Sequence, residues 1–114
     1  MQNAAIIDVN DFLKKITEGY TLFGHMAASL ATEIHSLQPE VIEHKCRKLN
    51  DERLRLSILD DQLIEILSLA GTELTYNDHL NHYRKAFSSA VQSVNSVHDQ
   101  LLYIRQSLQD VTRH

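Results

Sequence analysis

The sequence predicts an all-α fold: an elongated antiparallel three-helix bundle whose helices run up, down and up in a single domain over residues 1–114. Two observations lead to this prediction. The chain has 3 Gly and 1 Pro among 114 residues, which leaves almost no turn residues for the many short strands of a sandwich or barrel. Three long stretches, at about 9–37, 39–70 and 78–112, place apolar residues alternately three and four positions apart, which is typical of helices that share one core.

The first stretch begins at Val9, because residues 1–8 show no clear period. Gly19 and Gly24 fall off its apolar seam, and each weakens the helix by about 1 kcal/mol relative to Ala. We expect one helix over 9–37, with Phe23 buried on the seam. The seam positions are Val9, Leu13, Ile16, Tyr20, Phe23, Ala27, Leu30, Ile34 and Leu37.

The second stretch is bounded by Pro39 and Gly71. Proline lacks an N–H and fits the first turn of a helix, and glycine is favoured just after a helix ends. Arg53 and Asp60 interrupt the seam. Each of them either meets an opposite charge on a neighbouring helix or leans outward while apolar neighbours fill the core. The apolar seam positions are Ile42, Cys46, Leu49, Leu56, Leu63, Leu67 and Ala70.

The third stretch, residues 78–112, has the most regular seam. A helix of this length is about 52 Å long, and short connections make the three helices antiparallel neighbours. We expect Leu56 of the second helix and either Val94 or Val97 of the third to be buried with Phe23. The seam positions are Leu80, Tyr83, Phe87, Ala90, Val94, Val97, Leu101, Ile104, Leu108 and Val111.

The composition excludes several classes of function. With 11 Lys and Arg against 15 Asp and Glu, the net charge is −4, whereas a duplex-binding domain is usually basic. There is no run of about 18 apolar residues, the first residues do not resemble a signal peptide, and the single Cys makes no internal disulfide. We therefore expect a cytoplasmic protein that neither binds nucleic acid nor inserts into a membrane.

The polar residues do not form a recognisable catalytic or metal-binding pattern. Asp78, His79 and His82 lie within one helical turn, but zinc needs three or four converging ligands and no second cluster has suitable spacing. Asp60 and Asp61 are adjacent, so they point to different faces of a helix. We expect no metal, no cofactor and no enzymatic activity.

Residues 82–88, HYRKAFS, resemble the His-x-x-Lys-Gly-x-Ser/Ala run of histidine phosphotransfer domains, which are also helical bundles. The resemblance implies that His82 accepts a phosphoryl group and that Lys85 offsets its charge. Ala86 stands where that family has Gly, and one helix remains where that fold has two. A phosphotransfer domain that uses His82 is therefore the alternative function.

Residues 94–108 carry a second resemblance, to the C-terminal region of flagellar export chaperones of the FlgN type. Those proteins have an Asn-x-x-Asn spacing, then a Leu pair, then a Ser-Leu step on a long last helix. Residues 41–56 also look like their middle segment, and the resemblance extends over residues 40–111. The matching residues are Asn95, Leu101, Leu102, Ser107 and Leu108, and His98 stands in place of the second Asn.

This resemblance implies a non-catalytic cytoplasmic chaperone. It would hold the terminal helices of hook–filament junction proteins until the flagellar type III export apparatus takes them. An acidic helical rod with a very apolar last helix is compatible with helix-in-groove recognition. Two alternatives remain open: every seam residue is used in the internal core, or the chain is a coiled-coil subunit whose seams pair between copies. The protein is expected to be a monomer or a homodimer.

The expected client site lies on the third helix, which is predicted to be about six residues longer than the first and to overhang the corner at 37–39. Leu102 and Tyr103 follow a seam position and should point away from the core. Apolar surface of this kind usually marks an interaction site. The expected partner-binding residues are Leu101, Leu102, Tyr103, Leu108 and Val111.

Overall fold

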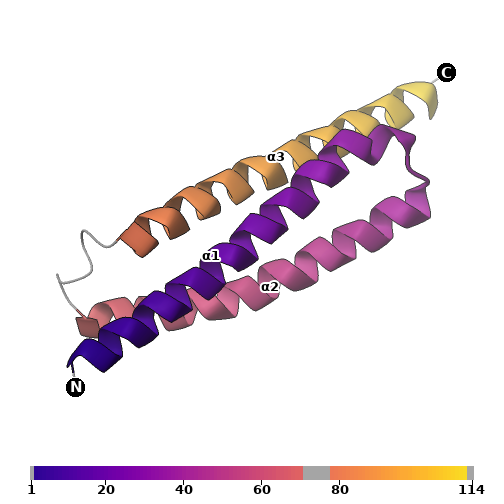
Figure 1. Cartoon of the computed structure of the whole chain (residues 1–114). Coiled ribbons are helices and arrows are strands. Elements are labelled where there is room, and N and C mark those ends of the chain that lie inside the picture. The colour runs from indigo at the N-terminus through magenta and orange to yellow at the C-terminus, as the bar shows by residue number, and fades with distance from the viewer. Residues whose placement is uncertain (1, 71–77, 113–114) are drawn as a thin grey trace.

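The computed structural model describes residues 2–70 and 78–112, and the side chains of 9–69 and 78–109. It confirms the all-α helical bundle. The elements are α1 (Gln2–Glu33), the short 3-10 helix η1 (Ile34–Ser36), α2 (Pro39–Ala70) and α3 (Asp78–Thr112). The helices run up, down and up (Figure 1), and the molecule measures 69 × 21 × 19 Å.

The first helix is longer at its start than the sequence predicts. It begins at Gln2 rather than Val9, so α1 has 32 residues against 35 in α3. The segment before Val9 lacks a clear apolar period, but it contains Ala4 and Ala5 and no Gly or Pro. Good helix formers extend a helix that packing has already nucleated further along the chain.

The first helix also ends earlier than predicted, at Glu33 rather than Leu37. Residues 34–36 tighten into the 3-10 turn, and Leu37 is extended, with φ −94° and ψ 149°. Pro39 begins α2 as expected, and the backbone carbonyl of Gln38 accepts hydrogen bonds from the N–H groups of Val41 and Ile42, each at 3.0 Å. The predicted helix end at Gly71 lies outside the described residues.

The core runs along the axis of the rod and is centred on α1. Helix α1 packs closely against α3 and more loosely against α2. Phe23, Leu56 and Val97 are all buried, as the sequence predicts, and Val94 is half-buried. The buried apolar residues are Leu13, Ile16, Tyr20, Phe23, Ala27, Leu30, Ile34, Leu56, Leu63, Leu80, Ala90 and Val97.

Both glycines of α1 lie at helix contacts, so the prediction that they fall off the packed seam is wrong. A Cβ atom on Gly24 would lie 3.3 Å from the Cα atom of Ala90 in α3, and one on Gly19 would lie 2.7 Å from the Cδ2 atom of Leu56 in α2. A pattern of apolar side chains cannot reveal such positions, because glycine contributes by lacking a side chain. Here it lets another helix approach closely.

One polar cluster joins the three helices near the middle of α1. Asp60 of α2 accepts a hydrogen bond from the phenol of Tyr20 in α1 and one of 2.6 Å from the phenol of Tyr83 in α3. The rings of Tyr20 and Tyr83 also pack edge to face, with centroids 5.8 Å apart. Asp60 therefore meets two neutral donors, rather than the opposite charge or the solvent that the sequence left open.

The environment of these phenols keeps them protonated. Burial, followed by the hydrogen bond to Asp60, raises the pKa of both Tyr20 and Tyr83 well above the ordinary value for tyrosine. Because the folded state holds these protons more tightly, their contribution to stability is complete below the ordinary pKa. It is lost only as the pH rises above that value.

Candidate functional site

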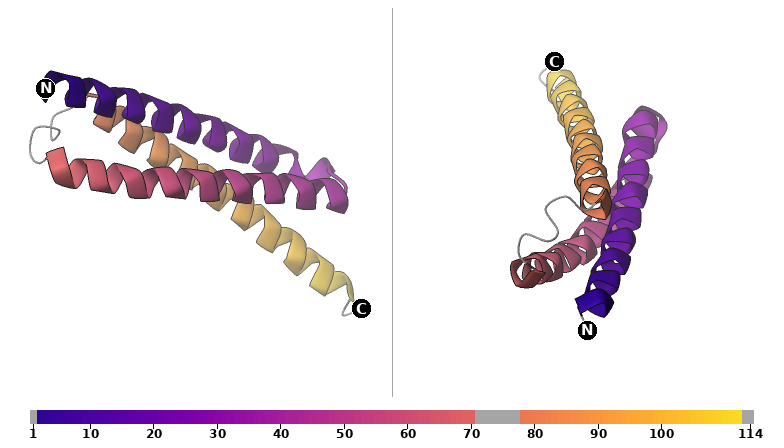
Figure 2. Two further views of the ribbon diagram at one scale, coloured as in Figure 1. Left: turned by 90° about the horizontal axis from the view of Figure 1, so that it is seen from below. Right: turned by 60° about the vertical axis from the view of Figure 1, so that its left-hand side comes forward.

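An apolar groove lies between α2 and α3, the two helices that have few close backbone approaches. Its floor is Phe23 of α1, and its volume is about 210 Å³. Figure 2 shows why the groove is open: the C-terminal half of α3 diverges from α2. The lining residues are Phe23, Cys46, Leu49, Asn50, Arg53, Val94, Val97, His98 and Leu101.

A shallow hollow continues the groove along the free end of α3. It has a volume of about 350 Å³ and is lined by Leu101, Ile104, Arg105, Leu108 and Gln109. Because Leu101 lines both, the groove and the hollow form one surface. We call this surface the α2–α3 groove.

The rim of the α2–α3 groove is polar and carries basic groups. The Arg53 guanidinium donates to the Asn50 side-chain oxygen on the same helix at 3.0 and 3.3 Å. Arg53 is thus exposed along the rim, the second of the two arrangements that the sequence left open for it. Arg105 lines the hollow. Within the groove, burial raises the pKa of the Cys46 thiol, so this side chain acts as a small apolar group.

The structure separates the predicted partner-binding residues into different faces. Leu102 is 41% exposed, and Tyr103 and Leu108 are each 62% exposed. Leu101 and Leu108 are two turns apart and share one face, whereas Leu102 and Tyr103 are rotated away from Leu108 by more than 100° at 3.6 residues per turn.

The exposed residues therefore do not form the single predicted strip. The Tyr103 ring packs edge to face on His35 in η1, with centroids 5.9 Å apart. Of the predicted set, Leu101 and Leu108 line the α2–α3 groove. The side chain of Val111 lies outside the described residues.

Sequence reasoning missed the part of the groove that α2 provides. Cys46 and Leu49 are seam positions and were assigned to the internal core, but both line the groove. A signal was present in the second seam, because Arg53 and Asp60 interrupt it. Both belong to the side of α2 that faces α3, where the two helices leave room for polar groups.

The residues of the phosphotransfer alternative lie on α3, near its start. His82 and Lys85 are both exposed, and the His82 ring is 6.5 Å from that of His79, centroid to centroid. Ala86 lies one turn after His82 on α3 and is half-buried. It packs against the core and lines a shallow hollow between α1 and α3. The transfer of a phosphoryl group to His82 stays a prediction.

Within the described part of the chain, no group of three or more His, Cys, Asp or Glu residues is placed to hold a metal ion. None of the described helices combines the length and the hydropathy that crossing a membrane requires.

Comparison with protein-family models, characterised proteins and solved structures gives no match for this chain.

Proposed function

We propose that this protein is a non-catalytic chaperone that binds a helical segment of a client protein in the α2–α3 groove. One observation carries the proposal: an apolar groove floored by Phe23 continues onto the exposed Leu108 at the free end of α3. Apolar surface that is contiguous and rimmed by polar groups is typical of an interaction site.

The spacing of the groove residues favours a helical client. Val94, Val97, Leu101, Ile104 and Leu108 are separated by three or four residues, so they form one stripe about 21 Å long on α3. An amphipathic helix inserts apolar side chains at the same spacing when it lies in a groove between two helices. The client would then complete a local four-helix arrangement with α1, α2 and α3.

The sequence resemblance supports a specific client. Leu101 and Leu108, which match flagellar export chaperones of the FlgN type, also line the α2–α3 groove. We therefore take the clients to be the terminal helices of hook–filament junction proteins. The chaperone would act in the cytoplasm, keep these apolar helices from aggregating, and release them to the flagellar type III export apparatus.

Replacing Leu108 with Asp tests this proposal. Calorimetric titration with the terminal segments of hook–filament junction proteins should show saturable binding to the unchanged protein. We expect Leu108→Asp to weaken binding about tenfold or more, which is at least about 1.4 kcal/mol, because a carboxylate would be buried against an apolar helix. Leu108 is 62% exposed, so the substitution should leave the fold intact.

The matched control is Ile58→Asp, because Ile58 is 61% exposed and lies on α2 away from the groove. The affinity of Ile58→Asp for the client segment should stay within about twofold of that of the unchanged protein, because a surface substitution outside the site has little effect. The proposed function is wrong if none of the terminal segments binds. The assignment of the groove is wrong if Leu108→Asp binds as tightly as the control.

A further inference from the structure

A second cavity lies on the other side of α2, between α1 and α2 near the corner that joins them. Its volume is about 410 Å³. We call it the α1–α2 cavity. Its lining residues are His25, Met26, Ser29, Leu30, His44, Lys45, Lys48 and Leu49.

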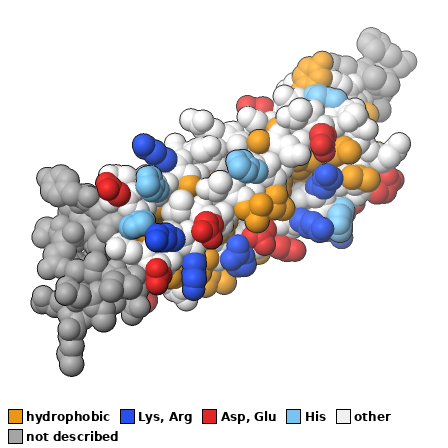
Figure 3. Space-filling model, viewed as in Figure 1, with side chains coloured by type: hydrophobic (Ala, Val, Ile, Leu, Met, Phe, Trp, Pro, Cys, Tyr) orange, Lys and Arg blue, Asp and Glu red, His pale blue; other side chains and the backbone are white. Residues whose placement is uncertain are grey.

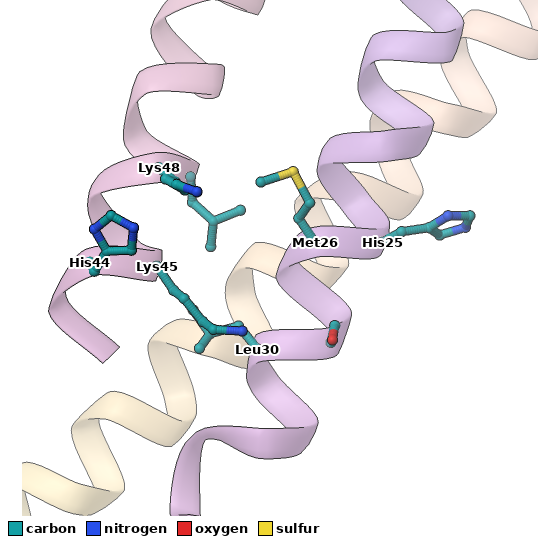
Figure 4. A pocket seen from close by; sticks show the side chains of 8 residues that line it. His25, Met26, Leu30, His44, Lys45 and Lys48 are labelled. Carbon is teal, nitrogen blue, oxygen red and sulfur yellow. The ribbon is translucent and has the colours of Figure 1, made fainter. Parts of the chain in front are cut away.

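The two walls of this cavity differ in chemistry (Figure 4). Met26 and Leu30 come from α1, and Met26 points across the cavity toward α2, whereas His25 points away. His44, Lys45 and Lys48 come from α2, and the long side chain of Lys45 extends toward α1. One wall is therefore apolar and the opposite wall is basic.

The apolar wall continues beyond the cavity with a helical repeat. Leu22 lies one turn before Met26 on α1 and is 59% exposed. Leu22, Met26 and Leu30 thus follow one another every four residues, and His44 and Lys48 show the same spacing on α2. Figure 3 shows basic side chains next to apolar ones where α1 meets the first half of α2.

The basic wall has charge that the chain does not neutralise. Lys45 pairs with Glu33 at 3.6 Å, and both side chains are about half exposed. Among the described residues, no carboxylate lies within ion-pair distance of Lys48. Although the chain as a whole carries a net charge of −4, the unpaired ammonium group of Lys48 therefore attracts an acidic partner to this wall.

We propose that the α1–α2 cavity binds an acidic amphipathic helix of a protein partner. Leucine-type side chains of that helix would pack on Leu22 and Met26, and its Asp or Glu residues would pair with Lys48 and with Lys45. A helix is favoured over a small anionic molecule because the apolar wall repeats every four residues over two turns of α1, from Leu22 to Leu30, and His44 and Lys48 lie one turn apart on α2. This spacing matches the neighbouring positions of a helix surface. The inference is independent of the client proposal, since only Leu49 borders both cavities.

The test uses two labelled helical peptides of about four turns, identical except that one carries Glu and the other Lys beside its leucine stripe. Fluorescence anisotropy at low salt should show that the unchanged protein binds the Glu peptide at least about tenfold more tightly, and that added salt reduces the difference. Lys48→Glu should weaken binding of the Glu peptide at least about tenfold. The matched control is Lys85→Glu, because Lys85 is an exposed lysine on α3. This substitution should change the affinity for the Glu peptide by less than about twofold.

A second pair of variants tests the place of binding. Leu22→Asp should weaken binding of the Glu peptide, because it puts a negative charge on the apolar wall. Leu108→Asp should leave that binding unchanged, and Lys48→Glu should leave client binding unchanged. Circular dichroism of each variant checks that the bundle is still folded.

The inference would be overturned by equal affinity for the two peptides, by unchanged affinity in Lys48→Glu, or by loss of binding in Leu108→Asp. Loss of binding in Leu108→Asp would place the acidic helix in the α2–α3 groove instead. Binding of dodecanoate in the cavity without any binding of the Glu peptide would also overturn it, and would identify the ligand as a free amphiphilic anion. Loss of client binding alone would count against the proposed function and not against this site.

Discussion

Phe23→Ala should lower the free energy of unfolding by about 3–5 kcal/mol, the usual cost of deleting a buried aromatic ring. Phe23 is 5% exposed and packs in the central core cluster with residues of all three helices. Its removal leaves a cavity in the core that α1 shares with α2 and α3. Urea denaturation followed by circular dichroism measures the change in the unfolding midpoint and slope.

The neighbouring Leu22 gives a matched control, since it is 59% exposed on the same helix. Leu22→Ala should cost less than about 1 kcal/mol, as surface substitutions do. A loss below about 1 kcal/mol for Phe23→Ala itself would show that the ring is not part of the core and that the floor of the α2–α3 groove is wrongly placed.

Asp60→Ala should have the second large effect on stability, a loss of about 2–4 kcal/mol. The substitution removes the acceptor that the phenols of Tyr20 and Tyr83 share. A buried donor left without a partner costs about 1–3 kcal/mol, and Tyr20 is only 7% exposed. Thermal and urea unfolding would measure the loss.

The control for this prediction is the same substitution in a chain that already carries Tyr20→Phe and Tyr83→Phe. Without phenol donors, Asp60→Ala should cost less than half as much, because no donor is left unpaired. Asp61→Ala, at the exposed neighbouring position, should change stability by less than about 0.5 kcal/mol. Equal costs of Asp60→Ala in the two backgrounds would contradict the shared-acceptor network.

Much of the fold follows from apolar spacing and from a few breaks in it. The regular seam of residues 78–112 predicts α3, and Pro39 predicts the start of α2, because spacing and proline geometry are local properties. The seams also identify Phe23, Leu56 and Val97 as core residues. The early start of α1 at Gln2 was missed, because good helix formers extend a helix without any apolar period.

The features that depend on distances between helices could not be predicted from one sequence. Gly24 is a contact point because Ala90 of another helix lies against it, and no pattern within α1 encodes that approach. In the same way, the sequence shows that Asp60 is a polar residue within an apolar seam, but it does not show its partners. Tyr20 and Tyr83 lie on other helices, 40 and 23 residues away in the chain.

The candidate site was predicted only in part for the same reason. Leu101 and Leu108 were identified from their place on the last helix, and both line the groove. Leu102 and Tyr103 were grouped with them because they are apolar residues off the seam, but they lie on other faces of α3. Which seam residues face a groove and which face the core depends on how far α3 diverges from α2, which no single helix pattern specifies.

The central claim is that the α2–α3 groove receives a helix of a client, and chemical-shift mapping tests it most directly. Backbone ¹H–¹⁵N spectra of the labelled protein would be recorded during titration with an unlabelled terminal segment of a hook–filament junction protein. We predict saturable shifts concentrated at residues 46–53 of α2 and 94–108 of α3, and their loss in Leu108→Asp. Spectra that do not change, or saturable shifts confined to the outer face of α2 around Leu54 and Ile58, would contradict the claim.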